Sequence, residues 1–495
     1  MSANELLGSD NRNRLKELAK GSFSEESILK DLASDEPSCR RDAALILFHH
    51  ACKKAPNTEG SAFIEALAET LKQPRAREGI DVHAWATCAE ATLAALHPLV
   101  EAGADRLLEE DFLLPLIPYT EVGRPWNTDA AASTAKSLVD GQLSGEKKQD
   151  FVTRVVLQRY LRPLFSKSTS SVTAEGRPAL FREPPPPNGG FHEQKAAWKD
   201  AGPHVVTVFA WAVEASEPST IKQHWPLYVP VLVTLAEDGD VAVRQCGLDV
   251  LGRFLAACPA EVLRASGVDA VFEASVLPSL LFLPSLTPEA ESVPLLRAAY
   301  HVLHALALAA GADDPAAARR RALLDRTLRE GVFAGYFHAS QHVRVVEVLM
   351  RAAAEIVQAL EVYAVKHLQS LLDLFTPVLT DAFALAYPPA VLAAAQALNT
   401  TILNCWPRII GTPHAEHIIS IASRCWINVH DQDSGDWGPE LESLADELSK
   451  TMMLVATLWK ESDEVIPVEK LARIVQKAPS LKPLFAPFRL EKSTA

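Results

Sequence analysis

Residues 225–306 contain a helical hairpin that can be stable only inside a larger stack of helices. From Leu227 to Ala236 the apolar residues recur at the spacing of one helix face, which predicts a helix with one buried side. The sequence Glu-Asp-Gly-Asp at 237–240 breaks this helix, and the side chain of Asp240 can cap the next one. A second apolar stripe follows and stops at Pro259. Two antiparallel helices cannot bury both apolar faces alone, so this hairpin requires neighbours of the same kind.

The second-helix pattern occurs three times and begins each time at an arginine, namely Arg41, Arg244 and Arg344. The first two copies reach a proline fifteen residues later, at Pro56 and Pro259. Helical hairpins of roughly 40–47 residues, with a repeated apolar pattern in the second helix, are typical of HEAT repeats. The sequence therefore predicts an all-α fold, a HEAT-like α-solenoid of antiparallel helical hairpins.

Acidic turn residues and early second-helix arginines can pair with the next repeat in such a stack. We therefore interpret Asp240, Arg244 and Arg344 as a structural ladder rather than as a functional site. We expect both arginines to be partly buried, each beside a turn carboxylate.

A proline-interrupted apolar segment, LPSLLFLPSLTP, follows the central hairpin. Each proline removes a backbone donor, so this segment cannot form one straight helix. We expect a short helix over about 271–283, then a turn, then a new helix that begins at Pro288.

Composition agrees with stacked helices, because 48% of the 495 residues are hydrophobic but only 7% are aromatic. The formal net charge of −14 argues against binding to nucleic acid or to anionic lipid. Seven scattered cysteines without a CxxC pair indicate a reducing compartment. The polar N-terminus and the lack of about twenty consecutive apolar residues predict neither a signal peptide nor a membrane span.

The composition changes abruptly at residues 166–195, which are rich in Ser, Thr, Pro and Gly. We expect an N-terminal helical array at 1–165, a linker or ordered loop at 166–197, and a C-terminal array at 198–495. Polyproline and glycine favour a flexible hinge. The alternative is a segment that becomes ordered against a partner, with Phe181 and Phe191 as anchors.

No motif of a catalytic or nucleotide-binding site occurs in the chain. The group most similar to a metal site comprises His414, His417, Cys425 and His430, with Cys405 nearby, but its spacing is not that of a zinc site. We interpret these residues as helix-surface histidines and core thiols, and expect no catalytic residue, cofactor or metal.

Two Cys-Trp pairs stand twenty residues apart, at 405–406 and 425–426. Exposed tryptophans commonly anchor protein interfaces. Trp406, Trp426 and the nearby Arg408 are therefore candidates for partner binding.

Five blocks of the chain resemble one known family. They are LRPLFSKSTSSVTAEGR (161–177), AAWKDAGPHVVTVFAWAV (196–213), the hairpin at 225–255, the segment at 266–300 that contains VFE and LPSLLFLPSLTPEAES, and LNTTILNCWPRI (398–409). They are similar to a fungal-type version of the Tel-two-interacting protein two family, the small HEAT-repeat subunit of the triple-T (TTT) co-chaperone complex. The resemblance spans roughly residues 161–430 and is most specific in the LPSLLFLPSLTPEAES segment.

The resemblance implies a non-catalytic scaffold that works with the Tel-two protein and a larger HEAT-repeat subunit. Together they bring phosphatidylinositol-3-kinase-related kinases, the kinases of TOR and DNA-damage signalling, to the ninety-kilodalton heat-shock chaperone. It also implies a cytoplasmic and nuclear location. The alternative is a generic HEAT-repeat adaptor for nuclear transport or phosphatase scaffolding, which would show the same helical periodicity.

Overall fold

The protein is described by a computed structural model. Its described residues are 6–21, 23–53, 60–72, 81–102, 110–165, 197–309, 316–431, 438–462 and 467–488. Within these ranges all regular structure is helical, and no strand occurs. The prediction of an all-α fold is confirmed.

Contacts within the chain divide it into two compact units. The N-terminal unit comprises residues 1–234 and 257–262, and the C-terminal unit comprises 235–256 and 263–495. Most of the predicted 166–197 segment lies outside the described residues, so its nature stays a prediction. The helices that follow it, α11 (Ala197–Ala201) and α12 (His204–Ala215), pack within the N-terminal unit.

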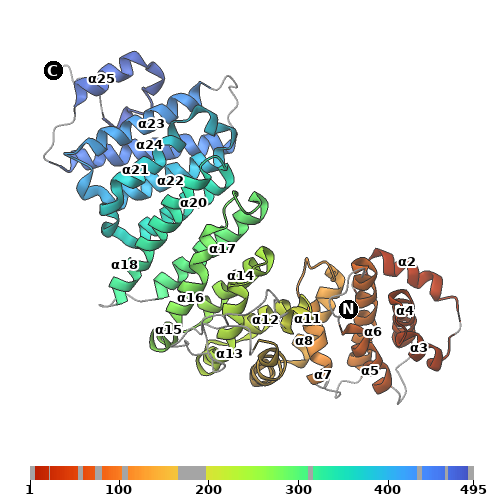
Figure 1. The fold of residues 1–495 in the computed structure, drawn as a ribbon. Coiled ribbons are helices and arrows are strands. Elements are labelled where there is room, and N and C mark those ends of the chain that lie inside the picture. The colour runs from red at the N-terminus through yellow and green to blue at the C-terminus, as the bar shows by residue number, and fades with distance from the viewer. Residues whose placement is uncertain are drawn as a thin grey trace. The chain divides into compact units, whose positions relative to one another are not determined.

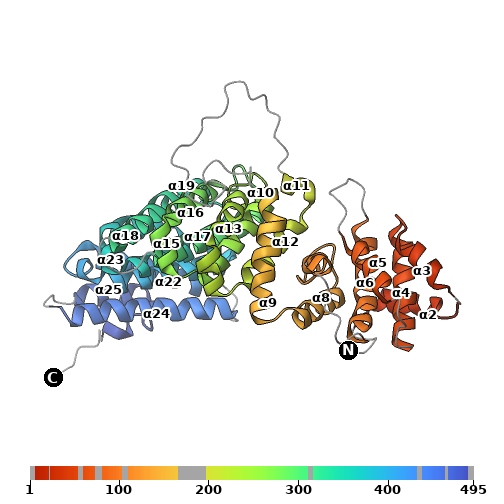
Figure 2. The ribbon, with the colours of Figure 1, turned by 90° about the horizontal axis from the view of Figure 1, so that it is seen from below.

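The other helices of the N-terminal unit form a stack of short hairpins (Figures 1 and 2). They are α2 (Ser9–Leu18), α3 (Glu25–Leu32), α4 (Pro37–Lys53), α5 (Gly60–Leu71), α6 (Val82–Ala102), α7 (Glu110–Leu113), η1 (Leu114–Tyr119), α8 (Asp129–Gln142), α9 (Gly145–Asp150), the π-helical η2 (Phe151–Leu161), α10 (Arg162–Phe165) and most of α13 (Pro218–Ala236).

The C-terminal unit is built from longer hairpins. Its elements are α14 (Val241–Ala257), most of α15 (Ala260–Ser266), α16 (Val268–Val276), η3 (Leu277–Leu281), α17 (Glu289–Ala309), α18 (Ala316–Arg326), the π-helical η4 (Thr327–Phe333), α19 (Ala334–Ala339), α20 (Val343–Leu360), η5 (Glu361–His367), α21 (Leu368–Thr380), η6 (Ala382–Ala386), α22 (Pro388–Cys405), η7 (Trp406–Arg408), α23 (Pro413–His430), α24 (Pro439–Lys460), α25 (Val468–Lys477), η8 (Pro479–Leu481) and η9 (Ala486–Phe488).

The second helices of successive hairpins form one layer of this unit. Helix α17 packs on α20, α20 on α22, and α22 on α24, so that they follow one another in Figure 1. The first helices, which include α16, α18, α21 and α23, form the other layer. This arrangement confirms the predicted HEAT-like stack of antiparallel hairpins.

The turn between α13 and α14 forms as the sequence indicates. The Asp240 carboxylate accepts hydrogen bonds from the backbone N–H groups of Ala242 (2.9 Å) and Val243 (3.1 Å), and so it caps α14. A Cβ atom at Gly247 would lie 2.6 Å from Cβ of Leu235, a separation too short for two carbon atoms. Gly247 therefore lets α14 approach the end of α13 closely.

The proline-interrupted segment is also helical, then turned, then helical. The short helix ends with η3 at Leu281, and α17 begins at Glu289. The Ser292 hydroxyl, in α17, donates to the carbonyl of Phe282 (2.6 Å). The backbone N–H of Thr287 donates to the carbonyl of Leu283 (2.9 Å). These bonds hold residues 282–288 as a compact turn.

Helix α17 is, by length and composition alone, apolar enough to cross a membrane. However, 61% of its most apolar stretch is buried inside the protein. It packs on α16, η3, α18 and α20, as a core helix of a helical stack does.

Candidate functional site

The predicted partner-binding residues fall in three different environments. Phe181 and Phe191 lie outside the described residues, so their role stays a prediction. Trp406 is 57% exposed at the start of η7, and Arg408 is exposed two residues later. Trp426 is only 6% exposed; it stacks on the His430 ring and donates its indole N–H to the backbone of Ser480 (2.9 Å). Trp426 is thus a packing residue, whereas Trp406 and Arg408 remain available to a partner.

Arg244 is buried and bridges to the next hairpin, but its partners differ from those expected. Its guanidinium donates to the carbonyls of Asp238 (2.8 Å) and Glu237 (3.0 Å) and to the hydroxyl of Ser279 in η3 (3.3 Å). It also lies 4.5 Å from the centre of the Phe282 ring. Burial lowers the pKa of Arg244, and the nearby carboxylates oppose this shift. The carbonyls at the end of α13 lack helical partners, and this explains why the arginine binds backbone rather than a turn carboxylate.

Arg344 does not have the predicted burial. Its side chain is 64% exposed, and its Nε lies 3.8 Å from a carboxylate oxygen of Glu289 at the start of α17. The other carboxylate oxygen of Glu289 lies 3.1 Å from Nδ1 of His342. Arg344 stands at the first turn of α20, on the rim of the stack, so its contact with the carboxylate of the neighbouring hairpin is exposed to solvent.

The histidines and cysteines at 405–430 do not converge on one point. Cys405 and Cys425 are buried, and burial raises the pKa of each thiol to about 12. His417 lies 3.1 Å from the Thr376 hydroxyl, and His430 packs on Trp426. Nowhere in the described part of the chain do three or more such ligands come together.

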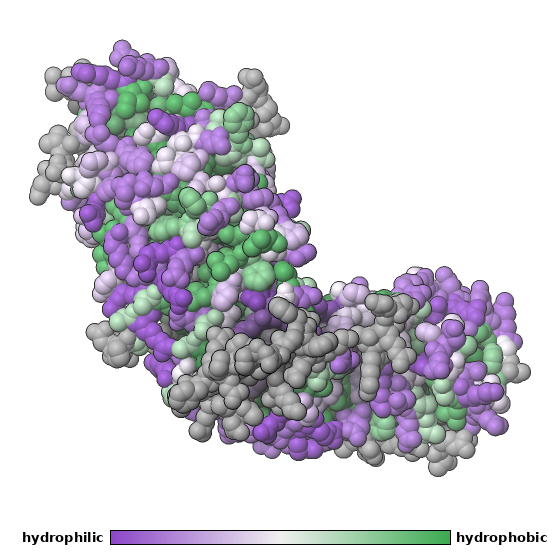
Figure 3. All heavy atoms as spheres, in the orientation of Figure 1, coloured by the Kyte–Doolittle hydropathy of each residue, from purple (hydrophilic) through white to green (hydrophobic). Residues whose placement is uncertain are grey.

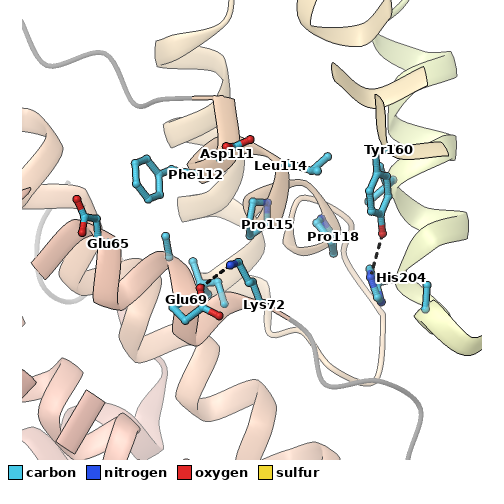
Figure 4. A pocket seen from close by; sticks show the side chains of 14 residues that line it. Glu65, Glu69, Lys72, Asp111, Phe112, Leu114, Pro115, Pro118, Tyr160 and His204 are labelled. Carbon is cyan, nitrogen blue, oxygen red and sulfur yellow. Dashed lines mark hydrogen bonds and ion pairs between the residues drawn. The ribbon is translucent and has the colours of Figure 1, made fainter. Parts of the chain in front are cut away.

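A cavity of about 520 Å³ lies within the N-terminal unit (Figure 4). Its described lining residues are Glu65, Ala68, Glu69, Leu71, Lys72, Asp111, Phe112, Leu114, Pro115, Pro118, Tyr160, Ala201, His204 and Val208. Lys72 pairs with Glu69, and Nε2 of His204 lies 3.2 Å from the Tyr160 hydroxyl. Burial lowers the pKa of His204 to about 4, so the imidazole is neutral at neutral pH. No serine, threonine or cysteine is among these lining residues, and the hydroxyl that contacts His204 there is that of Tyr160.

The turns that join the two helices of each hairpin carry the most exposed apolar side chains of the C-terminal unit. We call these turns, at 237–240, 282–288, 340–342 and 381–387, together with the residues that flank them, the turn edge. Leu286 and Phe383 are each 88% exposed, Phe337 is 81% exposed and Leu281 is 68% exposed. Figure 3 shows hydrophobic side chains interrupting the hydrophilic surface of this unit.

Contacts between neighbouring hairpins place these turns in series. The Ser275 hydroxyl of α16 donates to the carboxylate of Glu237 (2.9 Å) in the preceding turn. His342 contacts Glu289, and Tyr336 interacts electrostatically with Asp381 in the following turn. The turn edge is therefore a continuous surface with exposed apolar side chains and few ordered ion pairs. Such a surface suits protein binding rather than chemistry.

Comparison with known proteins decides the relationship of the chain. A model of the Tti2 family matches residues 112–386. The chain belongs to the Tti2 family. All four exposed apolar residues of the turn edge lie inside the matched range, whereas Trp406 and Arg408 lie beyond it.

Two solved structures are similar at low identity. A crystal structure of importin beta is 12% identical, with a TM-score of 0.46, over 98% of this chain and 64% of that chain. A crystal structure of a Kap121p mutant is 11% identical, with a TM-score of 0.29, over 97% of this chain and 59% of that chain. This Tti2-family chain spans about three-fifths of the length of each.

Sequence reasoning missed the aromatic residues of the turn edge. Phe337 lies near the end of the short helix α19 and Phe383 lies in the short helix η6, each close to the start of the next long helix. A search for large apolar residues inside predicted turns would have found both. The three consecutive arginines at 319–321 are a second notable feature of the sequence, because the net charge of the chain is −14.

Proposed function

We propose that this Tti2-family chain is a non-catalytic scaffold subunit of the TTT co-chaperone complex. In this proposal it binds the Tel-two protein and the larger HEAT-repeat subunit in the cytoplasm and the nucleus. The assembly supports the maturation and stability of phosphatidylinositol-3-kinase-related kinases with the ninety-kilodalton heat-shock chaperone.

The observation that carries the proposal is the family match over residues 112–386. A stack of helical hairpins agrees with it, because such stacks offer long surfaces for protein binding.

We assign the turn edge of the C-terminal unit to the larger HEAT-repeat subunit. Leu281 and Leu286 belong to the LPSLLFLPSLTPEAES segment, the part of the chain most specific to the family. Phe337 and Phe383 continue the same edge within the matched range. Helices of another HEAT-repeat protein carry apolar stripes that could cover these side chains.

The test is a pull-down of the tagged larger subunit, coexpressed with the wild-type chain or with a variant. The variant combines Leu286→Asp, Phe337→Asp and Phe383→Asp, all at exposed positions, so the fold should persist. Each residue that acts as an anchor contributes about 2 kcal/mol. We therefore expect the triple variant to bind at least tenfold more weakly.

Val122→Asp is the matched control, because Val122 is also exposed and lies in the family-matched range but belongs to the N-terminal unit. It should bind as the wild type does. If the triple variant binds normally, the assignment of the turn edge is wrong. If the wild-type chain captures no larger subunit at all, the proposed membership of the TTT complex is wrong.

A further inference from the structure

Four half-exposed apolar side chains gather on the edge of the C-terminal unit where one hairpin connects to the next. Val362 and Tyr363 are 52% and 53% exposed in η5, and Leu403 and Trp406 are 52% and 57% exposed at the end of α22 and in η7. We call these four residues the connection patch. The patch lies at the ends of the helices that the turn edge does not occupy.

Contacts between successive hairpins bring the two halves of the connection patch together. Helix α20 packs on α22 along its length, and η5 contacts η7 directly. The amide of Asn404, next to Leu403, lies 3.5 Å from the side-chain oxygen of Gln358, which stands one turn before Val362. Residues 362–363 and 403–406 therefore form one surface, although they are forty residues apart.

Guanidinium groups surround this surface. Arg321 lies over the Tyr363 ring, 4.4 Å from its centre, in a cation–π contact. Arg408 is exposed two residues after Trp406, and it forms no ion pair within the described chain. Arg320 donates to the carbonyl of Ala359 (3.1 Å) and so holds α18 against the end of α20.

The nearby carboxylates do not neutralise these arginines. Asp325 is already bound by Lys366 and by Nε2 of His367 (2.8 Å), so its charge is compensated. Glu361 is exposed and precedes the patch. Arg321 and Arg408 therefore bring two positive charges to the patch, beside the exposed carboxylate of Glu361, in a chain whose net charge is −14.

The backbone at Glu361 is strained. Its φ is +53° and its ψ is −137°, a conformation that suits glycine, and among the described residues it is the one non-glycine residue with positive φ. This sharp break directs the chain into η5 and presents Val362 and Tyr363 at the surface. Strained backbone is commonly retained where it shapes a binding site.

We propose that the connection patch binds a short acidic peptide segment of a partner protein. One aromatic or large aliphatic side chain of the peptide packs between Tyr363 and Trp406. Its flanking Asp or Glu residues pair with Arg321 and Arg408. A single-stranded nucleic acid is the less suitable occupant. Two guanidinium groups would attract only a few of its phosphates, whereas the rest of this acidic chain would repel the remainder of a long polyanion.

The inference goes beyond the proposed function, since Leu403, Trp406 and Arg408 lie outside the family-matched range and the patch is separate from the turn edge. It can be tested on the full chain without any TTT partner. Its failure would leave the pull-down result on the turn edge unaffected.

The experiment selects a displayed library of random dodecapeptides on the purified full chain. The recovered peptides are then measured against a variant that combines Trp406→Ala with Arg408→Glu. Both positions are exposed, and thermal unfolding would show whether the variant remains folded. We expect the recovered peptides to be enriched in Asp and Glu beside an aromatic or leucine residue. We expect their affinity to fall at least tenfold in the variant and to weaken as salt rises.

Val122→Ala in the N-terminal unit is the matched control, because Val122 is 64% exposed and belongs to neither surface, and it should bind the selected peptides as tightly as the wild type. Recovery of no saturable binder, of peptides without acidic enrichment, or of peptides that bind the variant equally would each overturn the proposal. A labelled twenty-nucleotide oligothymidine serves as the competing ligand. Saturable binding of that oligonucleotide, lost in the same variant, would overturn the acidic-peptide assignment in favour of nucleic acid.

Discussion

At the scale of single residues, Arg244 shows how a buried charge contributes to this stack. Its guanidinium donates hydrogen bonds to two backbone carbonyls and to the Ser279 hydroxyl. In Arg244→Ala these three acceptors would lose their donor. Unsatisfied buried acceptors cost about 1–3 kcal/mol, so we expect the urea midpoint of unfolding to fall correspondingly. Arg344→Ala removes an exposed side chain and should change the unfolding free energy by less than about 0.5 kcal/mol. Equal midpoints for the two variants would contradict this distinction.

His204 makes the stability of the N-terminal unit depend on pH. Its pKa is lowered to about 4 by burial, whereas an unfolded histidine has a pKa of 6.5. Below about pH 6.5 His204 binds a proton in the unfolded chain but stays neutral in the folded chain. The free energy of unfolding therefore falls as the pH drops from about 6.5 towards about 4. The loss is on the order of 3 kcal/mol at most.

His204→Gln removes this proton but keeps a hydrogen-bonding partner for Tyr160. We expect urea unfolding of the variant to lose less stability between pH 7 and pH 4.5 than unfolding of the wild type. Other buried histidines, such as His304, titrate equally in both proteins, so the difference isolates His204. Identical pH profiles would show that burial does not lower the pKa of His204 in the folded chain.

At the scale of helices, Gly247 sets the approach of α14 to the end of α13. Alanine normally stabilises a helix interior by about 1 kcal/mol relative to glycine. At Gly247 the added Cβ would meet backbone as well as side-chain atoms of Leu235, at 2.6–2.9 Å. We therefore expect Gly247→Ala to destabilise the protein by about 1–3 kcal/mol. Gly141→Ala in α8, where nothing lies within 4 Å, should be neutral or slightly stabilising, and a thermal unfolding scan would separate the two.

Helices were predictable where a single apolar face fixes the period. The second-helix pattern that begins at Arg344 forms α20 (Val343–Leu360), and the Asp240 cap and the break before Pro288 also follow from local chemistry. Depth of burial was not predictable, because the 3.6-residue period identifies the apolar side of a helix but not what covers it. Trp426 lies under η8, and Trp406 lies at an open end, although both follow a cysteine. The acceptors of Arg244 likewise depend on how two hairpins meet.

Across the C-terminal unit, the two proposed binding surfaces, the turn edge and the connection patch, lie at different ends of its helices. Obligate interfaces of such proteins commonly bury more than about 2,000 Å². A single exposed substitution on the turn edge should therefore weaken partner binding little, and the combined Leu286, Phe337 and Phe383 variant should weaken it strongly. A titration of partner capture with the three single variants and the triple variant would measure this difference. Equal loss in every single variant would indicate a small interface instead.

We propose that this Tti2-family chain maintains phosphatidylinositol-3-kinase-related kinases as part of the TTT complex. Deleting the gene and quantifying those kinases by mass spectrometry, together with their transcripts, tests this role. We expect several of these kinases to fall together while their transcripts stay constant, and the wild-type chain to restore them. Normal kinase levels, with loss of some unrelated cargo, would instead indicate a generic HEAT-repeat adaptor.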